Sequence, residues 1–151
     1  MKWLYIALVL IAGCVRPVPG PAPPPVPPVP IVEPITPAPL TVVVVKDNAS
    51  LGQLPSSQVA ALMSENIRGY CQTHCKFGSD GKTPEYRSYQ WATDVSLQSE
   101  GVRAAFKTAV DDAKGSRVPW LVVNNGKTGF SGPYPATEAE VLTILQRYGG
   151  A

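Results

Sequence analysis

The stretch V-P-W-L-V-V-N-N-G-K-T-G-F-S-G, residues 118–132, carries the pattern from which the rest of the fold is predicted. It reads as two strands joined at Asn125-Gly126, a dipeptide that accepts the positive φ angles of a tight hairpin turn. A helix should follow at once, because Thr137 and Glu140 have the spacing of a capping box and Gly149-Gly150 supplies a stop. The last third of the chain is therefore predicted to be a strand, a strand and a helix.

The residues upstream of this hairpin predict two more strands and two more helices. Thr41–Val45 is a β-branched run typical of a strand buried on both faces, and the aromatic segment 86–94 alternates as a second strand does. Apolar residues at spacings of three and four predict helices over 56–72 and 100–114, and Ser99 is placed to cap the second. The predicted order is strand, helix, strand, helix, strand, strand, helix, and its first connection is a right-handed parallel crossover.

This order, with Val118-Pro119-Trp120 entering the third strand and an N-G-K turn before the last helix, resembles the thioredoxin fold over about residues 41–150. The resemblance implies an α/β protein, a three-layer α/β/α sandwich with a mixed four-stranded sheet. It also implies a redox site between the first strand and the first helix, faced by a cis-proline that Pro119 matches by position. A cis peptide bond before proline is unusual unless tertiary contacts stabilise it. At the redox position itself, the loop over 48–55 begins N-A-S-L-G-Q and offers no thiol.

A thioredoxin-like domain without the usual Cys-x-x-Cys is expected to be a binding or interaction module. The family binds extended substrates where this loop faces the proline, so the resemblance implies a contact surface there. Its expected members are Asn48, Ala49, Ser50, Leu51, Gly52, Gln53, Val118, Pro119 and Trp120. No His or acid grouping is identifiable near Ser50, so we expect Ser50 to be a loop or cap residue and not a nucleophile. The expected partner is a protein or peptide, and no cofactor is expected.

Cys71 and Cys75 lie near the end of the first predicted helix, where the helix dipole disfavours a thiolate, so an activated nucleophile is not expected. Cβ atoms four residues apart on a helix are about 6 Å apart, which exceeds the usual span of a disulfide. A bond between the two therefore requires that the helix has ended. Export to an oxidising compartment favours a structural disulfide, and two thiols buried in the core are the alternative.

Two functional alternatives use the same cysteines. An atypical thiol-disulfide oxidoreductase would use Cys71 and Cys75, and it requires an exposed thiol of low pKa. With His74, the only His of the chain, the pair offers three soft ligands for a metal. Copper chaperones with a thioredoxin fold use Cys-x-x-x-Cys near the start of the first helix together with a downstream His. No His follows Cys75, so no metal is expected.

Residues 1–13 resemble a bacterial lipoprotein signal peptide. Lys2 precedes an apolar run over 3–12, and L-I-A-G-C at residues 10–14 is similar to the lipobox, in which signal peptidase cuts before a Cys that is then acylated. The apolar run is about half of the ~20 residues that a membrane-spanning helix needs. The resemblance implies export and a lipid anchor on Cys14, on the periplasmic face of the outer membrane if the host is Gram-negative.

Residues 14–40 combine the lipidated Cys with a proline-rich linker, because 12 of the 17 prolines lie between Arg16 and Leu40. At ~3.1 Å per residue, a polyproline chain of this length acts as a semi-rigid spacer of up to roughly 80 Å. The alternative is a docking site for a proline-reading module. An envelope-structural lipoprotein, in which the spacer matters more than the globule, is a further alternative function.

Charge and length restrict the function of residues 41–151. These 111 residues suffice for one domain and are too few for two. They contain 11 Lys and Arg against 10 Asp and Glu, a formal charge of +1, with no run of like charge. Nucleic acid is therefore not an expected partner.

Overall fold

The computed structural model describes residues 38–150, so the expected signal peptide, Cys14 and most of the linker lie outside the described residues. The described chain is an α/β domain with a mixed four-stranded sheet, as predicted. The strand order in the sheet is β2-β1-β3-β4. β1 (Thr41–Lys46) pairs in parallel with β2 (Tyr86–Gln90) and antiparallel with β3 (Trp120–Asn124). β4 (Gly129–Pro133) pairs antiparallel with the other side of β3 and forms an edge of the sheet.

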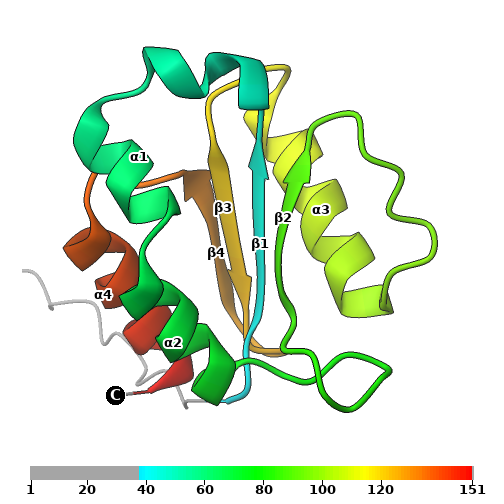
Figure 1. Cartoon of the computed structure of the whole chain (residues 1–151). Helices are drawn as coiled ribbons and strands as arrows, with labels where there is room; N and C mark the ends of the chain where they lie inside the picture. The colour runs from blue at the N-terminus through cyan, green and yellow to red at the C-terminus, as the bar shows by residue number, and fades with distance from the viewer. Residues whose placement is uncertain (1–37, 151) are drawn as a thin grey trace, which may run out of the picture. The chain divides into compact units, whose positions relative to one another are not determined.

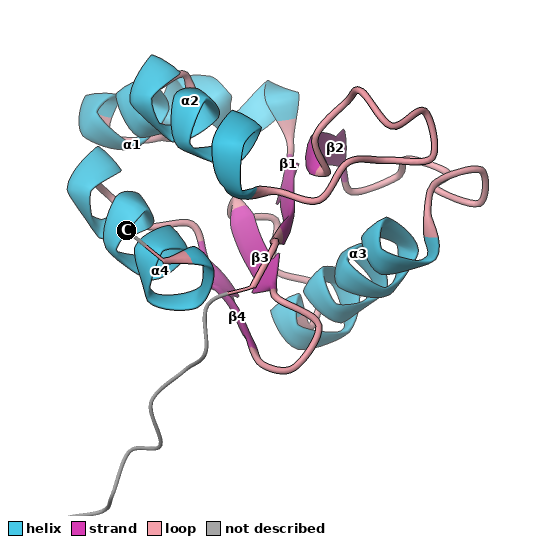
Figure 2. Ribbon diagram, turned by 90° about the horizontal axis from the view of Figure 1, so that it is seen from below, coloured by secondary structure: helices cyan, strands magenta, loops and turns pink. Residues whose placement is uncertain are grey.

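Helices cover both faces of this sheet, which gives three layers (Figures 1 and 2). One face carries three helices and the other carries α3. The four α-helices are α1 (Ser56–Leu62), α2 (Glu65–His74), α3 (Glu100–Ala113) and α4 (Glu138–Gly149).

β1 is the centre of two separate cores because its side chains alternate between the two faces. Val42 and Val44 pack in the core beneath α1, α2 and α4, while Val43 and Val45 pack beneath α3. All residues of Thr41–Val45 are buried, which confirms the prediction of a strand covered on both faces.

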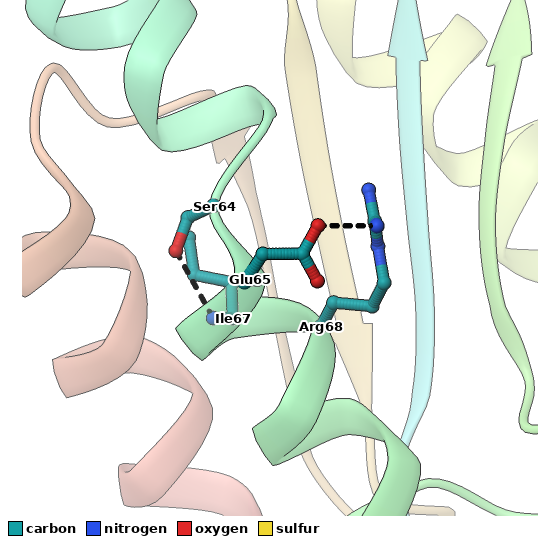
Figure 3. A network of polar contacts seen from close by, with 4 residues as sticks. All are labelled: Ser64, Glu65, Ile67 and Arg68. Carbon is teal, nitrogen blue, oxygen red and sulfur yellow. Dashed lines mark hydrogen bonds and ion pairs between the residues drawn. The ribbon is translucent and has the colours of Figure 1, made fainter.

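The single helix predicted over 56–72 is wrong in one respect, because the structure divides it into α1 and α2. α1 ends at Leu62, and the side chain of Ser64 accepts a hydrogen bond from the backbone N–H of Ile67 (3.2 Å), which begins α2 (Figure 3). In the same turn, Arg68 donates to Glu65 (2.7 Å), an exposed pair that stabilises little. The break redirects the chain, so α2 crosses toward the start of β1 (Figure 1).

The two helix caps predicted from the sequence are both present. Ser99 caps α3 by accepting from Val102 N–H, and Thr137 with Glu140 forms the predicted capping box of α4. The hairpin forms as well, and Gly126 has the positive φ of +84° that its turn requires. The predicted strand over 86–94 is shorter and ends at Gln90.

Candidate functional site

The structure brings the two halves of the predicted contact surface to one end of the sheet. Residues Asn48–Gln53 form a short 3-10 helix, η1, directly after β1, where a plain loop was predicted. Asp47 caps it by accepting from Ala49 N–H (2.9 Å). Trp120 begins β3 opposite Val45, so Val118–Trp120 lies at this same end of the sheet. Ser50 donates its hydroxyl to the carbonyl of Asp47 (2.9 Å), the local role predicted for it.

Pro119 departs from the expectation that accompanied the resemblance. No peptide bond in the described residues is cis, so the bond before Pro119 is trans. Its side chain is fully buried, and its carbonyl accepts from the backbone N–H of Tyr134 (2.7 Å). This hydrogen bond joins the residue before β3 to the β4–α4 connection. The pyrrolidine ring of Pro119 is therefore not part of the exposed surface. Of its neighbours, Val118 is 46% exposed, and Trp120 packs toward α3.

Beside Pro119 lies an apolar groove that the sequence reasoning missed. It has a volume of about 540 Å³ and is bounded by the β4–α4 connection and by one face of α4. Tyr134 forms the floor of the groove and is buried. It is held there by two hydrogen bonds: its hydroxyl donates to the carbonyl of Ala61 (3.2 Å), and its backbone carbonyl accepts from the side chain of Gln58 (2.6 Å). The stretch P-Y-P-A, residues 133–136, is the sequence signal for it. The lining residues are Pro133, Tyr134, Pro135, Ala136, Glu140, Thr143 and Ile144.

Cys71 and Cys75 lie in the core near the opposite end of β1 from η1. Both are buried as free thiols. The two cysteines lie 4.0 Å apart, a distance longer than the sulfur–sulfur bond of a disulfide. This arrangement is the alternative of two core thiols, and the favoured disulfide is not formed in the structure. A hydrogen bond with Cys75, together with burial, raises the pKa of the Cys71 thiol.

The contact between these thiols depends on where α2 ends. α2 stops at His74, and Cys75 is extended (φ −82°, ψ 153°) and bridges to Leu40. Cys75 therefore lies outside the helix, as close approach of the two cysteines requires. Leu40 itself is completely buried against them.

His74 does not join the two thiols. Its ring stacks on Tyr70 with the ring centroids 4.0 Å apart, and its Nδ1 lies 3.0 Å from the carbonyl of Tyr70. Within residues 38–150, no group of three or more His, Cys, Asp or Glu side chains is placed to hold a metal. The alternative site of Cys71, His74 and Cys75 is therefore absent from the described domain.

One buried acid was also missed by the sequence reasoning. Glu85, only 7% exposed, accepts from the Thr41 hydroxyl (2.5 Å) and from the Ser99 hydroxyl (2.6 Å). Thr41 begins β1 and Ser99 caps α3, so the carboxylate ties the start of α3 to the centre of the sheet. Its bonds are all internal, and we assign it a structural role.

Comparison of the chain with protein-family models, with curated proteins and with solved structures found no match. Among residues 38–150, no helix has the length and apolar character needed to cross a membrane. The candidate site is therefore assigned from the geometry of the described residues alone.

Proposed function

We propose that this protein is an exported lipoprotein that carries a thioredoxin-like domain as a non-catalytic binding module. Cys14 would hold the lipid, residues 15–40 would form the spacer, and the domain would bind a protein or peptide partner. The lipobox-like L-I-A-G-C at the end of an apolar run supports the anchor.

The arrangement of the sheet supports the thioredoxin-like part of this proposal. The resemblance implied a mixed sheet of four strands between two helical layers, and the described domain has this architecture. The order β2-β1-β3-β4, with the first pair parallel and the other two antiparallel, follows from one crossover and one hairpin. The chain differs from the family's pattern in the trans bond before Pro119 and in the lack of a Cys in η1.

The burial of both thiols is the observation that favours binding over catalysis. Thiol exchange requires a thiolate that a substrate disulfide can reach. Cys71 is completely buried, its pKa is raised by the contact with Cys75, and η1 at the family's redox position contains no Cys. What the C-terminal end of β1 offers instead is an exposed Val118 and, beside it, the apolar groove along α4.

The binding surface is tested with two matched substitutions of exposed aliphatic side chains. Val118→Asp places a charge at the proposed surface. Leu97→Asp places one in the loop before α3, where Leu97 lines a hollow with Glu85, the residue before β2, at the other end of the sheet. Peptides selected from a random display library on the full chain serve as the probe. We expect Val118→Asp to weaken their binding at least tenfold in fluorescence anisotropy and Leu97→Asp to change it less than twofold. Equal loss in both variants, or no selected peptide at all, contradicts the proposed function.

The anchor is tested separately by metabolic labelling with palmitate in a Gram-negative bacterium. The full chain should incorporate label and fractionate with membranes, whereas Cys14→Ser should do neither. Labelling that persists in Cys14→Ser contradicts the lipobox assignment, and this result would leave the binding surface to be judged on its own experiment.

The proximity of the two thiols keeps an oxidoreductase as a second candidate. A pair at 4.0 Å is close enough to form a disulfide after small side-chain rotations. Equilibration of the full chain in glutathione buffers, followed by alkylation and mass spectrometry, separates the candidates. The proposed binding module predicts no interconversion across the glutathione range, whereas interconversion, with one thiol alkylated quickly below neutral pH, would favour the oxidoreductase.

A further inference from the structure

The outer edge of β4 has unpaired backbone groups. Tyr134, the residue after β4, donates its N–H to the carbonyl of Pro119 (2.7 Å) and so faces β3. Backbone groups alternate in direction along an antiparallel strand, so the even-numbered residues of β4 face β3 as well. Gly129, Ser131 and Pro133 therefore direct their carbonyls outward, and Gly129 and Ser131 also direct their N–H groups outward. Among the described strands, none lies beyond β4 (Figure 2).

The opposite edge of the sheet, formed by β2, is largely closed by its own flanking loops. Val42 of β1 donates its N–H to the carbonyl of Glu85 (2.8 Å), so the odd-numbered residues of β2 face β1 and the even-numbered ones face outward. The outward N–H of Tyr86 bonds to the loop before β2 (2.8 Å), and that of Gln90 bonds to the loop after it (3.1 Å). Ser88 alone is left between them on the described part of this edge. Of the two edges, β4 is therefore the one that can pair with another strand.

A groove of about 380 Å³ lies beside the β4 edge, on the face of the sheet covered by α3. Ala104 and Thr108 border it from α3, and both are small and exposed. Gly129 and Ser131 border it from β4. Ser131 accepts from Trp120 Nε1 (3.0 Å), and Trp120 packs toward α3, so the odd-numbered residues of β4 face α3. Directly opposed residues of paired strands point to the same face, so a strand paired here would place side chains over the groove.

Two lysine side chains lie at the start of β4. Lys127 is the only charged residue among those that line the groove. A Cβ at Gly126, in the turn before β4, would lie 3.6 Å from Nζ of Lys76. The ion pairs described within residues 38–150 involve neither lysine. This end of the β4 edge is therefore cationic, and it suits a partner that brings a carboxylate.

A second copy of β4 does not provide such a partner. In one antiparallel register the copy would place its Gly129 opposite Ser131, and its Pro133 would then lie opposite Lys127. A shift by two residues would place Pro135 there instead. Neither register offers a carboxylate to Lys127. The occupant that fits the edge is therefore a different sequence.

We propose that the β4 edge binds an extended peptide segment of a partner protein, antiparallel to β4, with the pattern apolar-x-apolar-x-acidic. The first apolar residue would exchange backbone hydrogen bonds with Ser131, and the second would exchange them with Gly129. Both apolar side chains would lie over the groove, and the acidic residue would lie beside Lys127. Main-chain bonds to a free sheet edge supply affinity in this binding mode, and alternate side chains supply specificity. This inference is independent of the function proposed for the surface around Val118.

The test uses the peptide T-V-T-V-T-E-T, acetylated and amidated at its ends, and follows the backbone amides of the full chain in detergent micelles by NMR. We expect saturable shifts of the Gly129 and Ser131 amides. N-methylation of the first Val removes an N–H directed at Ser131 and should weaken binding at least about tenfold. N-methylation of the following Thr removes an N–H directed at solvent and should weaken binding less than about threefold. Equal effects of the two methyl groups would overturn the proposal.

Substitutions in the peptide and the protein test the side chains. Replacing both valines of the peptide with Ser should weaken binding at least about fivefold, because the apolar contact with the groove is lost. Lys127→Glu should weaken binding about three- to tenfold and should strengthen binding of a peptide with Lys in place of Glu. Lys82→Glu, the same charge change in the loop before β2, should alter binding less than about twofold. Unchanged shifts of the Val43 and Val122 amides would show that the variants remain folded.

Three other outcomes would overturn the proposal. The first is the absence of shifts at Gly129 and Ser131 on addition of the peptide. The second is a set of shifts centred on Val118, because the peptide would then use the other surface. The third is a shift of the β4 amides that grows with protein concentration without peptide, because the occupant would then be a second copy of the chain.

Discussion

Asp80 illustrates what a single exposed side chain does in this protein. Its carboxylate accepts from the backbone N–H groups of Lys82 (3.0 Å) and Thr83 (2.9 Å) and from the Thr83 hydroxyl, and these bonds order the loop before β2. The hydroxyl of Thr83 is the leading cause that lowers the Asp80 pKa from 3.8 to about 2. Because the folded pKa is depressed, the carboxylate stabilises the fold above about pH 4, and this contribution is lost as the pH falls toward 2.

The corresponding prediction concerns the pKa of Asp80 itself. Thr83→Val removes the hydroxyl and should raise this pKa toward 3.8, as followed by NMR titration of the side-chain carboxyl. Lys82→Ala is the matched control, since Lys82 contributes only its backbone N–H, and it should leave the pKa unchanged. An equal shift in both variants would mean that the conformation of the loop, and not the Thr83 hydroxyl, sets the pKa of Asp80.

Two helical glycines are predicted to respond in opposite directions to the same substitution. A Cβ at Gly149 would lie 2.8 Å from both Leu40 Cδ1 and Tyr70 Oη, whereas a Cβ at Gly69 would meet nothing within 4 Å. Gly149→Ala should lower the free energy of unfolding by about 1–3 kcal/mol through overpacking. Gly69→Ala should raise it by about 0.5–1 kcal/mol through helix propensity. Urea denaturation measures both, and the same sign in the two variants would contradict the packing at Gly149.

At the scale of elements, the break between α1 and α2 depends on one cap. Ser64 accepts from Ile67 N–H, and α2 positions Ile67 and Cys71 in the core. Ser64→Ala should cost about 1 kcal/mol of unfolding free energy. Ser57→Ala, at an exposed position early in α1 where no cap is made, should change it by less than about 0.5 kcal/mol. Denaturation curves for the pair give the comparison, and a neutral Ser64→Ala would mean that packing alone places the break.

The elements also show why the sequence predicted most of the secondary structure and missed this break. The apolar stripe continues across it, because Val59, Met63 and Ile67 follow one another at steps of four residues. Periodicity alone therefore predicts one helix. Ser64 is a strong N-cap residue, but its preference acts only where the chain can turn.

At the scale of the whole molecule, the thiols should react only when the domain unfolds. Cys71 and Cys75 are buried in the core with residues of α2, β1 and α4, so we expect an alkylating reagent to reach them only after unfolding. We expect alkylation of the native protein at pH 8 to be at least a hundredfold slower than in urea. It should also accelerate in Gly149→Ala in proportion to the lost stability. Fast alkylation of the native full chain would contradict the burial and would favour the oxidoreductase.

The order of strands and helices, apart from η1 and the break between α1 and α2, could be predicted from the sequence, as could the buried character of β1 and the caps at Ser99 and Thr137. These features are local, because they depend on side-chain periodicity and on residues three or four positions apart. Only the tertiary structure decided that Pro119 is buried and trans, that the two thiols meet in the core and that a groove lies along α4. Each of these is set by contacts between residues distant in sequence, such as Tyr134 with Pro119 and Leu40 with Cys75, and no local pattern encodes such contacts.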